Sequence, residues 1–192
     1  MFKKILPVLF LFLTFCTPVI PSRYKIDNVP YVQQIGNTCG SAALTSVMNY
    51  YKYNVSLQEV SLALSPGIKE DLGTSSPKYM EIFSKEKGFE FVFFKDYTKN
   101  CIKYYISKGF PVIIFGKICE GWYDNYWPLR VVHFLVIIGY DEKKELFIVK
   151  DPNMGDKEII VSYEILKKFN IHDNYSKTVI VIFPKGEKSG SK

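Results

Sequence analysis

Histidine is scarce in this 192-residue sequence, with two copies at His133 and His172. Cysteine is the other reactive residue in short supply, with four copies, and neither residue type shows the spacing of metal ligands. We therefore expect no metal and no other cofactor. His172 lies in a polar stretch, residues 170–174, where a solvated side chain is expected. His133 is left as the one histidine in an apolar run, so any histidine chemistry points there.

The sequence also lacks a basic stripe interleaved with aromatic residues. Its net charge of +6 is modest. Part of that charge lies on lysines at the two ends, at positions 3, 4, 185, 188 and 192. Nucleic acid is therefore not an expected partner. The hydrophobic content of 47% instead predicts one well-packed globular domain.

The apolar run near the start of the chain is too short to cross a bilayer. Residues 5–15 follow a short positive segment, a pattern that predicts a signal peptide over residues 1–22 with cleavage after Ser22. Residues 13–16 also resemble a lipoprotein signal ending in Cys16, although Phe15 stands where that pattern has a small residue. Lipidation, simple secretion and an uncleaved anchor stay open. In each case we expect an exported protein that touches a membrane only through this segment or a lipid.

The rest of the chain predicts one α+β domain over residues 23–184, followed by a disordered tail over 185–192. Ser56 followed by Glu59 is a capping-box signal for a helix start. Expected helices cover 39–51, 57–64, 77–87, 96–108 and 163–169. Expected strands cover 89–94, 110–115, 131–139, 145–150, 157–162 and 178–183. Helices thus dominate the first half, and we expect them to pack on an antiparallel sheet from the second half.

Cys39 opens the first expected helix and is followed by small residues, from Gly40 to Ala43. Backbone N–H groups and the helix dipole at this end favour an anion, so the position should lower the pKa of a thiol. The small side chains allow another group to approach the sulfur. We interpret Cys39 as a nucleophile, while packing remains the alternative for a lone cysteine.

Strand parity gives His133 a partner. If the hairpin loop between the two strands has three or five residues, His133 lies opposite Asp151 on one sheet face. A two-residue loop would place the two on opposite faces unless a bulge intervenes. The carboxylate would then orient the imidazole, as a catalytic base requires. A plain turn is the alternative for the segment that begins at Asp151.

These residues form a set in which each type has a chemical role. Cys39 would attack a carbonyl carbon, and His133 would take its proton and then protonate the leaving amine. Asp151 would hold the imidazole. The side-chain amide of Gln33 and the backbone N–H of Cys39 would stabilise the developing oxyanion. An ordinary polar residue near a strand end is the alternative for Gln33.

Four segments resemble one family, the papain-like cysteine peptidases of the C39-like, bacteriocin-processing type. They are Gln33 with Cys39-Gly40 six residues later, and the segments 109–113, 133–139 and 151–155, in that order. The resemblance covers about residues 29 to 183. It implies a papain-like fold and a peptide or protein substrate. It also implies Cys39 as nucleophile, His133 and Asp151 as base and orienting group, and Gln33 in the oxyanion hole, with Gln34 as a competitor.

Two departures limit what the resemblance implies. Family members that cut double-glycine leader peptides are commonly fused to a transporter with an ATPase domain, and this sequence has no phosphate-binding Gly-Lys-Ser/Thr loop. Ser41 also stands where the family often has proline. The substrate therefore does not carry over. An acyltransferase on the same scaffold and a catalytically silent surface binding protein remain alternatives to an exported peptidase or amidase.

Two further features stay open. Cys101 and Cys119 should lie at the same end of a helix and the strand that returns from it, so a disulfide and two separate thiols are equally expected. The segment 117–129 carries four large aromatic residues, including Trp122 and Trp127. It would either wall a substrate cleft or tuck its rings into the core, and burial is the favoured interpretation.

Overall fold

The computed structural model of the protein describes residues 20–65, 77–118, 132–170 and 178–186. Its helices are α1 Cys39–Tyr50, α2 Leu57–Leu64, α3 Pro77–Glu86, α4 Lys99–Ser107 and α5 Tyr163–Phe169. Its strands are β1 Arg23–Lys25, β2 Phe89–Phe94, β3 Val112–Lys117, β4 Val132–Asp141, β5 Leu146–Lys150, β6 Glu158–Ser162 and β7 Val179–Pro184. The predicted α+β class is confirmed, with most bounds within three residues. Strand β1 was not predicted from the sequence.

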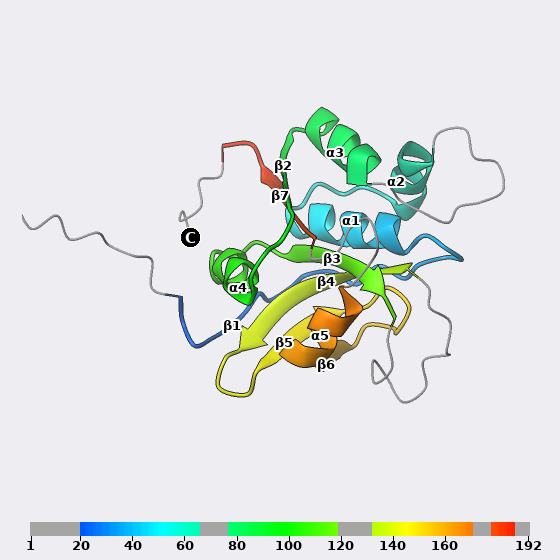
Figure 1. Cartoon of the computed structure of the whole chain (residues 1–192). Helices are drawn as coiled ribbons and strands as arrows, with labels where there is room; N and C mark the ends of the chain where they lie inside the picture. The colour runs from blue at the N-terminus through cyan, green and yellow to red at the C-terminus, as the bar shows by residue number, and fades with distance from the viewer. Residues whose placement is uncertain (1–19, 66–76, 119–131, 171–177, 187–192) are drawn as a thin grey trace, which may run out of the picture.

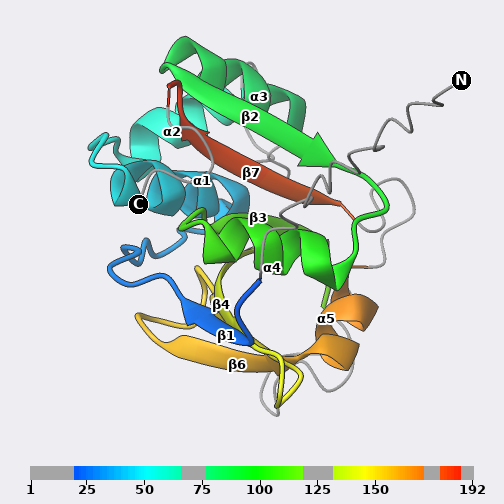
Figure 2. The same ribbon diagram turned by 90° about the vertical axis from the view of Figure 1, so that its left-hand side faces the viewer.

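The strands form one sheet in the order β2-β7-β3-β4-β5-β6, and β1 pairs with the far end of β4. Each strand pairing in the described chain is antiparallel. Helices α1, α2 and α3 group on one side of the central strands (Figure 1). Figure 2 shows α5 at the opposite side of the molecule from α1, with strands between them. This is the expected papain-like arrangement of N-terminal helices on an antiparallel sheet.

Helix α1 is enclosed by the rest of the domain. Ten consecutive residues, from Cys39 to Met48, are buried, so polar and apolar faces are covered alike. Its main contacts are with α2 and β4. A helix buried on all sides must present small side chains where neighbours approach, and Gly40, Ala42 and Ala43 meet that need. The enclosure fixes the position of the first turn of α1, where Cys39 lies.

Two helix starts show how the local sequence sets boundaries. The Ser56 hydroxyl accepts a hydrogen bond from the Glu59 N–H at 3.1 Å, as predicted for a cap. Helix α4 begins at Lys99, three residues later than expected, where the Thr98 side chain caps it by accepting from the Cys101 N–H. Asp96 has a positive φ of 54°, a conformation that no α-helix accommodates.

The register of the β4–β5 hairpin differs from the prediction. Asp141 pairs with Leu146, which leaves a four-residue loop instead of three or five. An even loop alone would place His133 and Asp151 on opposite faces of the sheet. A β-bulge at Ile138 adds one residue to β4, and this returns the two side chains to the same face. The prediction that His133 and Asp151 share a face is therefore confirmed, whereas the prediction that they lie directly opposite each other is wrong.

The N-terminal segment before β1 is bonded to the sheet. The Tyr140 hydroxyl donates to the Pro21 carbonyl at 2.8 Å, and the Glu142 N–H donates to the Ser22 carbonyl at 2.8 Å. These bonds cross the boundary that the sequence suggested between residues 22 and 23. Among the described residues no helix combines the length and the hydrophobicity needed to cross a membrane.

Several predictions fall on segments outside the described residues. They concern the signal segment before residue 20, the aromatic stretch with Trp122 and Trp127, His172, and the tail after residue 186. Cys101 is a half-buried free thiol in the structure, and the choice between a disulfide and separate thiols depends on its expected partner. Cys119 itself is outside the described residues.

Candidate active site

Cys39 lies at the first position of α1, the end of the helix that favours negative charge. The residue before it, Thr38, does not cap the helix with its side chain. Its hydroxyl instead closes the preceding turn, accepting from the Ile35 N–H and donating to the Ile35 carbonyl, both at 2.9 Å. The first turn of α1 carries no acidic residue. The local sequence thus leaves the N-terminal N–H groups of α1 without a side-chain cap from Thr38.

His133 lies near the start of β4, where it is paired with Gly116 of β3. A Cβ atom at Gly116 would lie 2.0 Å from the backbone oxygen of Phe169, at the end of α5. Only glycine allows this approach, so α5 and the sheet meet directly beside the histidine. The side chain of His133 is 5% exposed. Its ring is therefore held by packing on a rigid strand.

Asp151 follows the last residue of β5 and is fully buried. Its Oδ1 atom lies 2.6 Å from Nε2 of His133 and also accepts a hydrogen bond from the Asn153 N–H at 2.8 Å. A buried carboxylate is tolerated when its oxygens are hydrogen-bonded in this way. Because β4 and β5 pair Val136 with Lys150, Asp151 reaches His133 diagonally along the shared face.

The imidazole joins the carboxylate to the sulfur. Burial by itself lowers the pKa of His133, but hydrogen bonds to Asp151 and to Cys39, with the charges of those two groups, outweigh burial and raise this pKa to about 9. Since Nε2 contacts Asp151, Nδ1 is the nitrogen left to face the thiol. The structure therefore brings together a thiol, an imidazole and a carboxylate that are distant in sequence.

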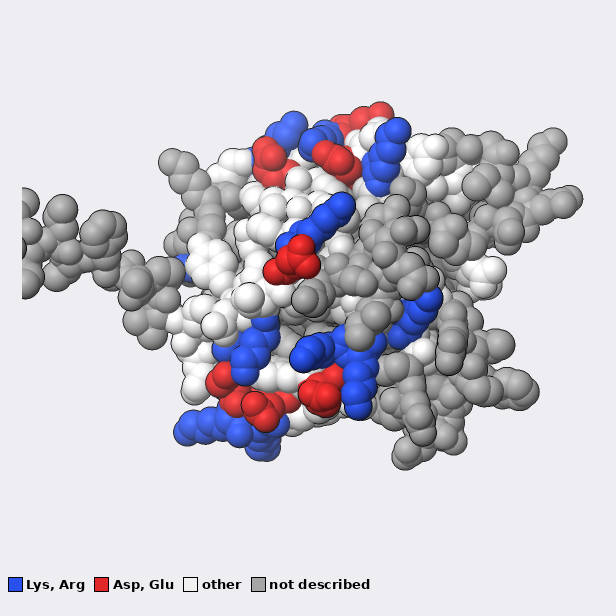
Figure 3. Space-filling view, viewed as in Figure 1, with Lys and Arg blue, Asp and Glu red and all other residues white. Residues whose placement is uncertain are grey.

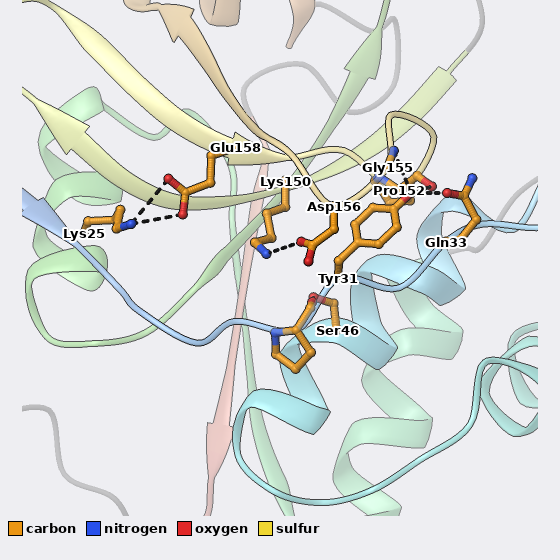
Figure 4. Close-up of polar contacts among 10 residues, drawn as sticks. Lys25, Tyr31, Gln33, Ser46, Lys150, Pro152, Gly155, Asp156 and Glu158 are labelled. Atoms are coloured by element: carbon orange, nitrogen blue, oxygen red, sulfur yellow. Dashed lines mark hydrogen bonds and ion pairs between the residues drawn. The ribbon is translucent and has the colours of Figure 1, made fainter.

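The loop after Asp151 is held by the extended segment before α1. The Tyr31 hydroxyl contacts the Pro152 carbonyl and the Gly155 N–H, both at 2.9 Å, and the side-chain oxygen of Gln33. Figure 4 shows the Tyr31 ring running up to Pro152 and Gly155, with the exposed side chain of Gln33 beside them. The Gln34 N–H also donates to the Pro152 carbonyl, at 3.0 Å. The segment with the two glutamines is thus bonded to the segment with the carboxylate.

The two glutamines have different side-chain environments. Gln33 is exposed, and its Oε1 is the atom that accepts from Tyr31. Gln34 is half-buried, and its Nε2 donates to the Gly36 carbonyl at 2.7 Å. Among the described residues, the buried Oε1 of Gln34 has no hydrogen-bond partner. Because the Oε1 of Gln33 accepts from Tyr31, its NH₂ group is the part of the amide left to act as a donor.

Sequence reasoning selected Gln33, Cys39, His133 and Asp151 but missed Tyr31. A usable signal was present, because Tyr31 and Gln33 are two residues apart in an extended segment and such side chains lie on the same side. Among the described residues, no group of three or more His, Cys, Asp or Glu side chains is arranged to hold a metal ion.

Comparison with known proteins gives the family from a family model and the fold from solved structures. The model of the Peptidase_C39 like family matches residues 26–179. A C39-like peptidase from Bacillus anthracis has a TM-score of 0.65 at 15% identity, covering 86% of this chain and 99% of that one. A double glycine motif protease from an AMS/PCAT transporter, solved with the leader peptide, gives 0.57 at 21% identity, covering 84% and 94%.

A third similar structure is the peptidase domain of Streptococcus ComA, with a TM-score of 0.54 at 23% identity over 82% of this chain and 100% of that one. No curated protein matches the sequence. At these identities the solved structures show the shared fold, and the family model covers well over half of the chain. The chain belongs to the Peptidase_C39 like family and is a cysteine peptidase.

Proposed function

We propose that this cysteine peptidase is exported and hydrolyses a peptide bond through a Cys39–His133–Asp151 triad. The observation that carries the proposal is the buried chain of contacts from Asp151 through the imidazole to the sulfur. The raised pKa of His133 keeps the imidazole protonated near neutral pH. An imidazolium beside a thiol favours the thiolate. The ionised pair is the reactive form of a cysteine nucleophile.

The reaction would run through two acyl-transfer steps. The sulfur of Cys39 bonds to the carbonyl carbon, and the peptide C–N bond breaks as His133 protonates the leaving amine. Water then attacks the thioester, giving up its proton to His133 and releasing the carboxylic acid and the thiol. Asp151 keeps the ring oriented through both steps. The substrate is a peptide, by analogy with the related protease that was solved with a leader peptide.

We assign the oxyanion hole to the backbone N–H of Cys39 and the side-chain amide of Gln33. Gln33 is favoured over Gln34 because Gln34 already donates its Nε2 to a backbone carbonyl. Removal of one oxyanion-hole donor lowers kcat by about 10²- to 10³-fold in a measured case. Gln33→Ala should show a loss of that order, and Gln34→Ala should stay within a few-fold of the wild type.

The experiment that tests the triad is alkylation by iodoacetamide followed by peptide mapping. Cys39 should be modified at neutral pH far faster than Cys101, whose thiol has a pKa raised by burial. Cys39→Ala should abolish both this modification and peptide cleavage, and His133→Ala should slow both. Equal modification of the two cysteines, or cleavage that survives Cys39→Ala, would refute the proposal.

Export is proposed from the positive and apolar segments within residues 1–22. Fractionation of the full chain, expressed in a bacterial host with a C-terminal tag, tests it. Protein outside the cytoplasm is expected for the full chain and not for a chain that starts at Ile20. Incorporation of labelled palmitate that is lost in Cys16→Ala would identify lipidation, and its absence would leave secretion or an uncleaved anchor.

A further inference from the structure

Tyr31 is the residue where two parts of the site meet. It comes from the extended segment before α1, whereas the loop that it contacts follows β5. The Gly155 N–H donates to its hydroxyl at 2.9 Å, and the single hydroxyl proton is shared between the Pro152 carbonyl at 2.9 Å and Oε1 of Gln33. One phenol thus links the loop that carries Asp151 to the amide of Gln33 (Figure 4).

The orientation of an amide side chain is decided by its partners. Oxygen and nitrogen differ in role, so a donor that holds Oε1 turns the NH₂ group to the other side. Burial raises the pKa of Tyr31 and the negative charge of Asp151 raises it further, against the effect of the Gly155 N–H. The phenol therefore stays protonated and acts as a donor to Gln33 over the working pH range.

We propose that Tyr31 is a positioning residue for peptide-bond hydrolysis. Its hydroxyl holds the Gln33 amide so that the NH₂ group is available to the oxyanion, and it fixes the position of this amide relative to the loop that follows Asp151. The inference rests on the proposed function, because it gives Gln33 the oxyanion role. Tyr31 touches no reacting atom in this scheme. It acts through Gln33, and so its effect should be confined to steps in which an oxyanion forms.

Two probes separate such a role from simple support of the fold. Acylation of Cys39 by p-nitrophenyl acetate forms a tetrahedral oxyanion, then the thioester, and expels p-nitrophenolate. Alkylation by iodoacetamide replaces iodide at a saturated carbon and forms no oxyanion. Tyr31→Phe should slow acylation about tenfold, a fraction of the effect of losing the donor itself. The same variant should leave the alkylation rate within twofold of the wild type.

The matched control is Tyr140→Phe. Tyr140 is fully buried, and its hydroxyl also donates to a backbone carbonyl, that of Pro21, at the far end of β4. It should lower the Tm by a comparable amount and change neither rate. A double variant supplies the second measurement. Tyr31→Phe should slow acylation no further when Gln33 is already Ala, because the amide that Tyr31 orients is then absent.

The outcomes separate failure of the inference from failure of the proposed function. If Tyr31→Phe slows both probes equally, or adds its full effect to Gln33→Ala, Tyr31 supports only the fold and the inference is overturned. If p-nitrophenyl acetate turnover survives Cys39→Ala, the proposed triad itself fails. Slower acylation with unchanged alkylation, lost in the Gln33→Ala background, supports the inference.

Discussion

Asp151 and Glu142 make polar contacts of the same length in two different settings. Oδ1 of Asp151 lies 2.6 Å from Nε2 of His133, and Oε2 of Glu142 lies 2.6 Å from Nζ of Lys103. The side chain of Asp151 is 0% exposed, whereas that of Glu142 is 36% exposed. Water screens the second pair and not the first, so equal distances correspond to unequal electrostatic coupling.

The two carboxylates also differ in the pKa values that their contacts change. Asp151 helps to raise the pKa of His133 to about 9, so the imidazole stays protonated. The pKa of Glu142 is lowered, mainly by the hydrogen bond from Lys103 and also by that from the Tyr163 hydroxyl. We call Glu142, Lys103 and Tyr163 the Glu142 cluster; it links α4 and α5 to the β4–β5 turn. Asp151, His133 and Cys39 form the Asp151 cluster, in which the imidazole and the thiol can form an ion pair.

Cavity size does not identify which cluster is the reactive one. A cavity of about 610 Å³ lies between α4 and α5, near the Glu142 cluster, and is lined by Lys99 and Tyr163 among others. Cys39, His133 and Asp151 do not line it. Basic and acidic side chains lie next to each other over the described part of the face seen in Figure 3. The chemistry of the groups, rather than the hollow, identifies the site.

The largest expected effect is on catalysis when the buried carboxylate is neutralised. Asp151→Asn keeps the shape but removes the charge that holds the imidazolium, and kcat should fall on the order of 10³- to 10⁴-fold. Glu142→Gln is the matched change in the screened cluster and should leave kcat within twofold. Steady-state cleavage of one peptide substrate, selected by screening a peptide library with the wild type, measures kcat for both variants. A comparable loss in the two variants would remove the distinction between the clusters.

The next largest effect is on stability beside His133. Gly116→Ala would place a methyl group 2.0 Å from the Phe169 carbonyl, so α5 or β3 must shift. Overpacking of this kind lowers the free energy of unfolding by about 1–3 kcal/mol, and we expect the upper end here. Gly139→Ala, whose nearest contacts are at 3.0–3.1 Å, should cost less. Urea denaturation compares the two, and equal losses would contradict the close approach of α5.

A smaller effect is expected from shortening the chain next to the Glu142 cluster. A chain beginning at Arg23 loses the hydrogen bonds from Tyr140 to Pro21 and from Glu142 to Ser22. At about 1 kcal/mol each, the loss relative to a chain beginning at Ile20 is about 2 kcal/mol. Thermal unfolding of the two chains measures it, and equal Tm values would show that the domain starts at residue 23. Mass spectrometry of the mature N-terminus gives the natural start.

The smallest effect is on pH-dependent stability. A lowered pKa means that Glu142 contributes stability above its unfolded-state pKa and loses it as pH falls through the folded value. Glu142→Gln should therefore cost about 1 kcal/mol near neutrality and nothing in strong acid. Denaturation from pH 7 down to about pH 2 measures how the free energies of unfolding of the two proteins converge. A difference that stays constant with pH would show that the charge of Glu142 is not its cause.

The raised pKa of His133 makes stability depend on pH in the opposite direction to Glu142. Its stability contribution is complete below the unfolded-state value and is lost as pH rises through about 9. In Asp151→Asn the loss should be complete at a lower pH, because the charge that raises the folded-state pKa of His133 is absent. Unfolding measured from pH 6 to 10 tests this shift. If the loss of stability at alkaline pH were the same in Asp151→Asn as in the wild type, Asp151 would not be the group that raises the pKa of His133.

Much of the fold could be predicted because its signals are local. Ser56 caps α2, apolar runs mark β2 and β4, and α5 has the predicted bounds. The expected start of α4 at Asp96 was wrong, because the positive φ of Asp96, which the sequence pattern did not specify, lies outside the helical region. Strand β1 has no apolar alternation, so its pairing with β4 could come only from the tertiary structure.

The sequence by itself determined the residue types available for chemistry: one cysteine at a helix start, one histidine in an apolar strand, and the carboxylate that begins the next loop. The tertiary structure decided their contact, since a bulge at Ile138 offsets an even hairpin loop and returns Asp151 to the face of His133. It also decided the role of Tyr31. Register and cross-segment hydrogen bonds depend on how distant segments pack, and no local pattern encodes that packing.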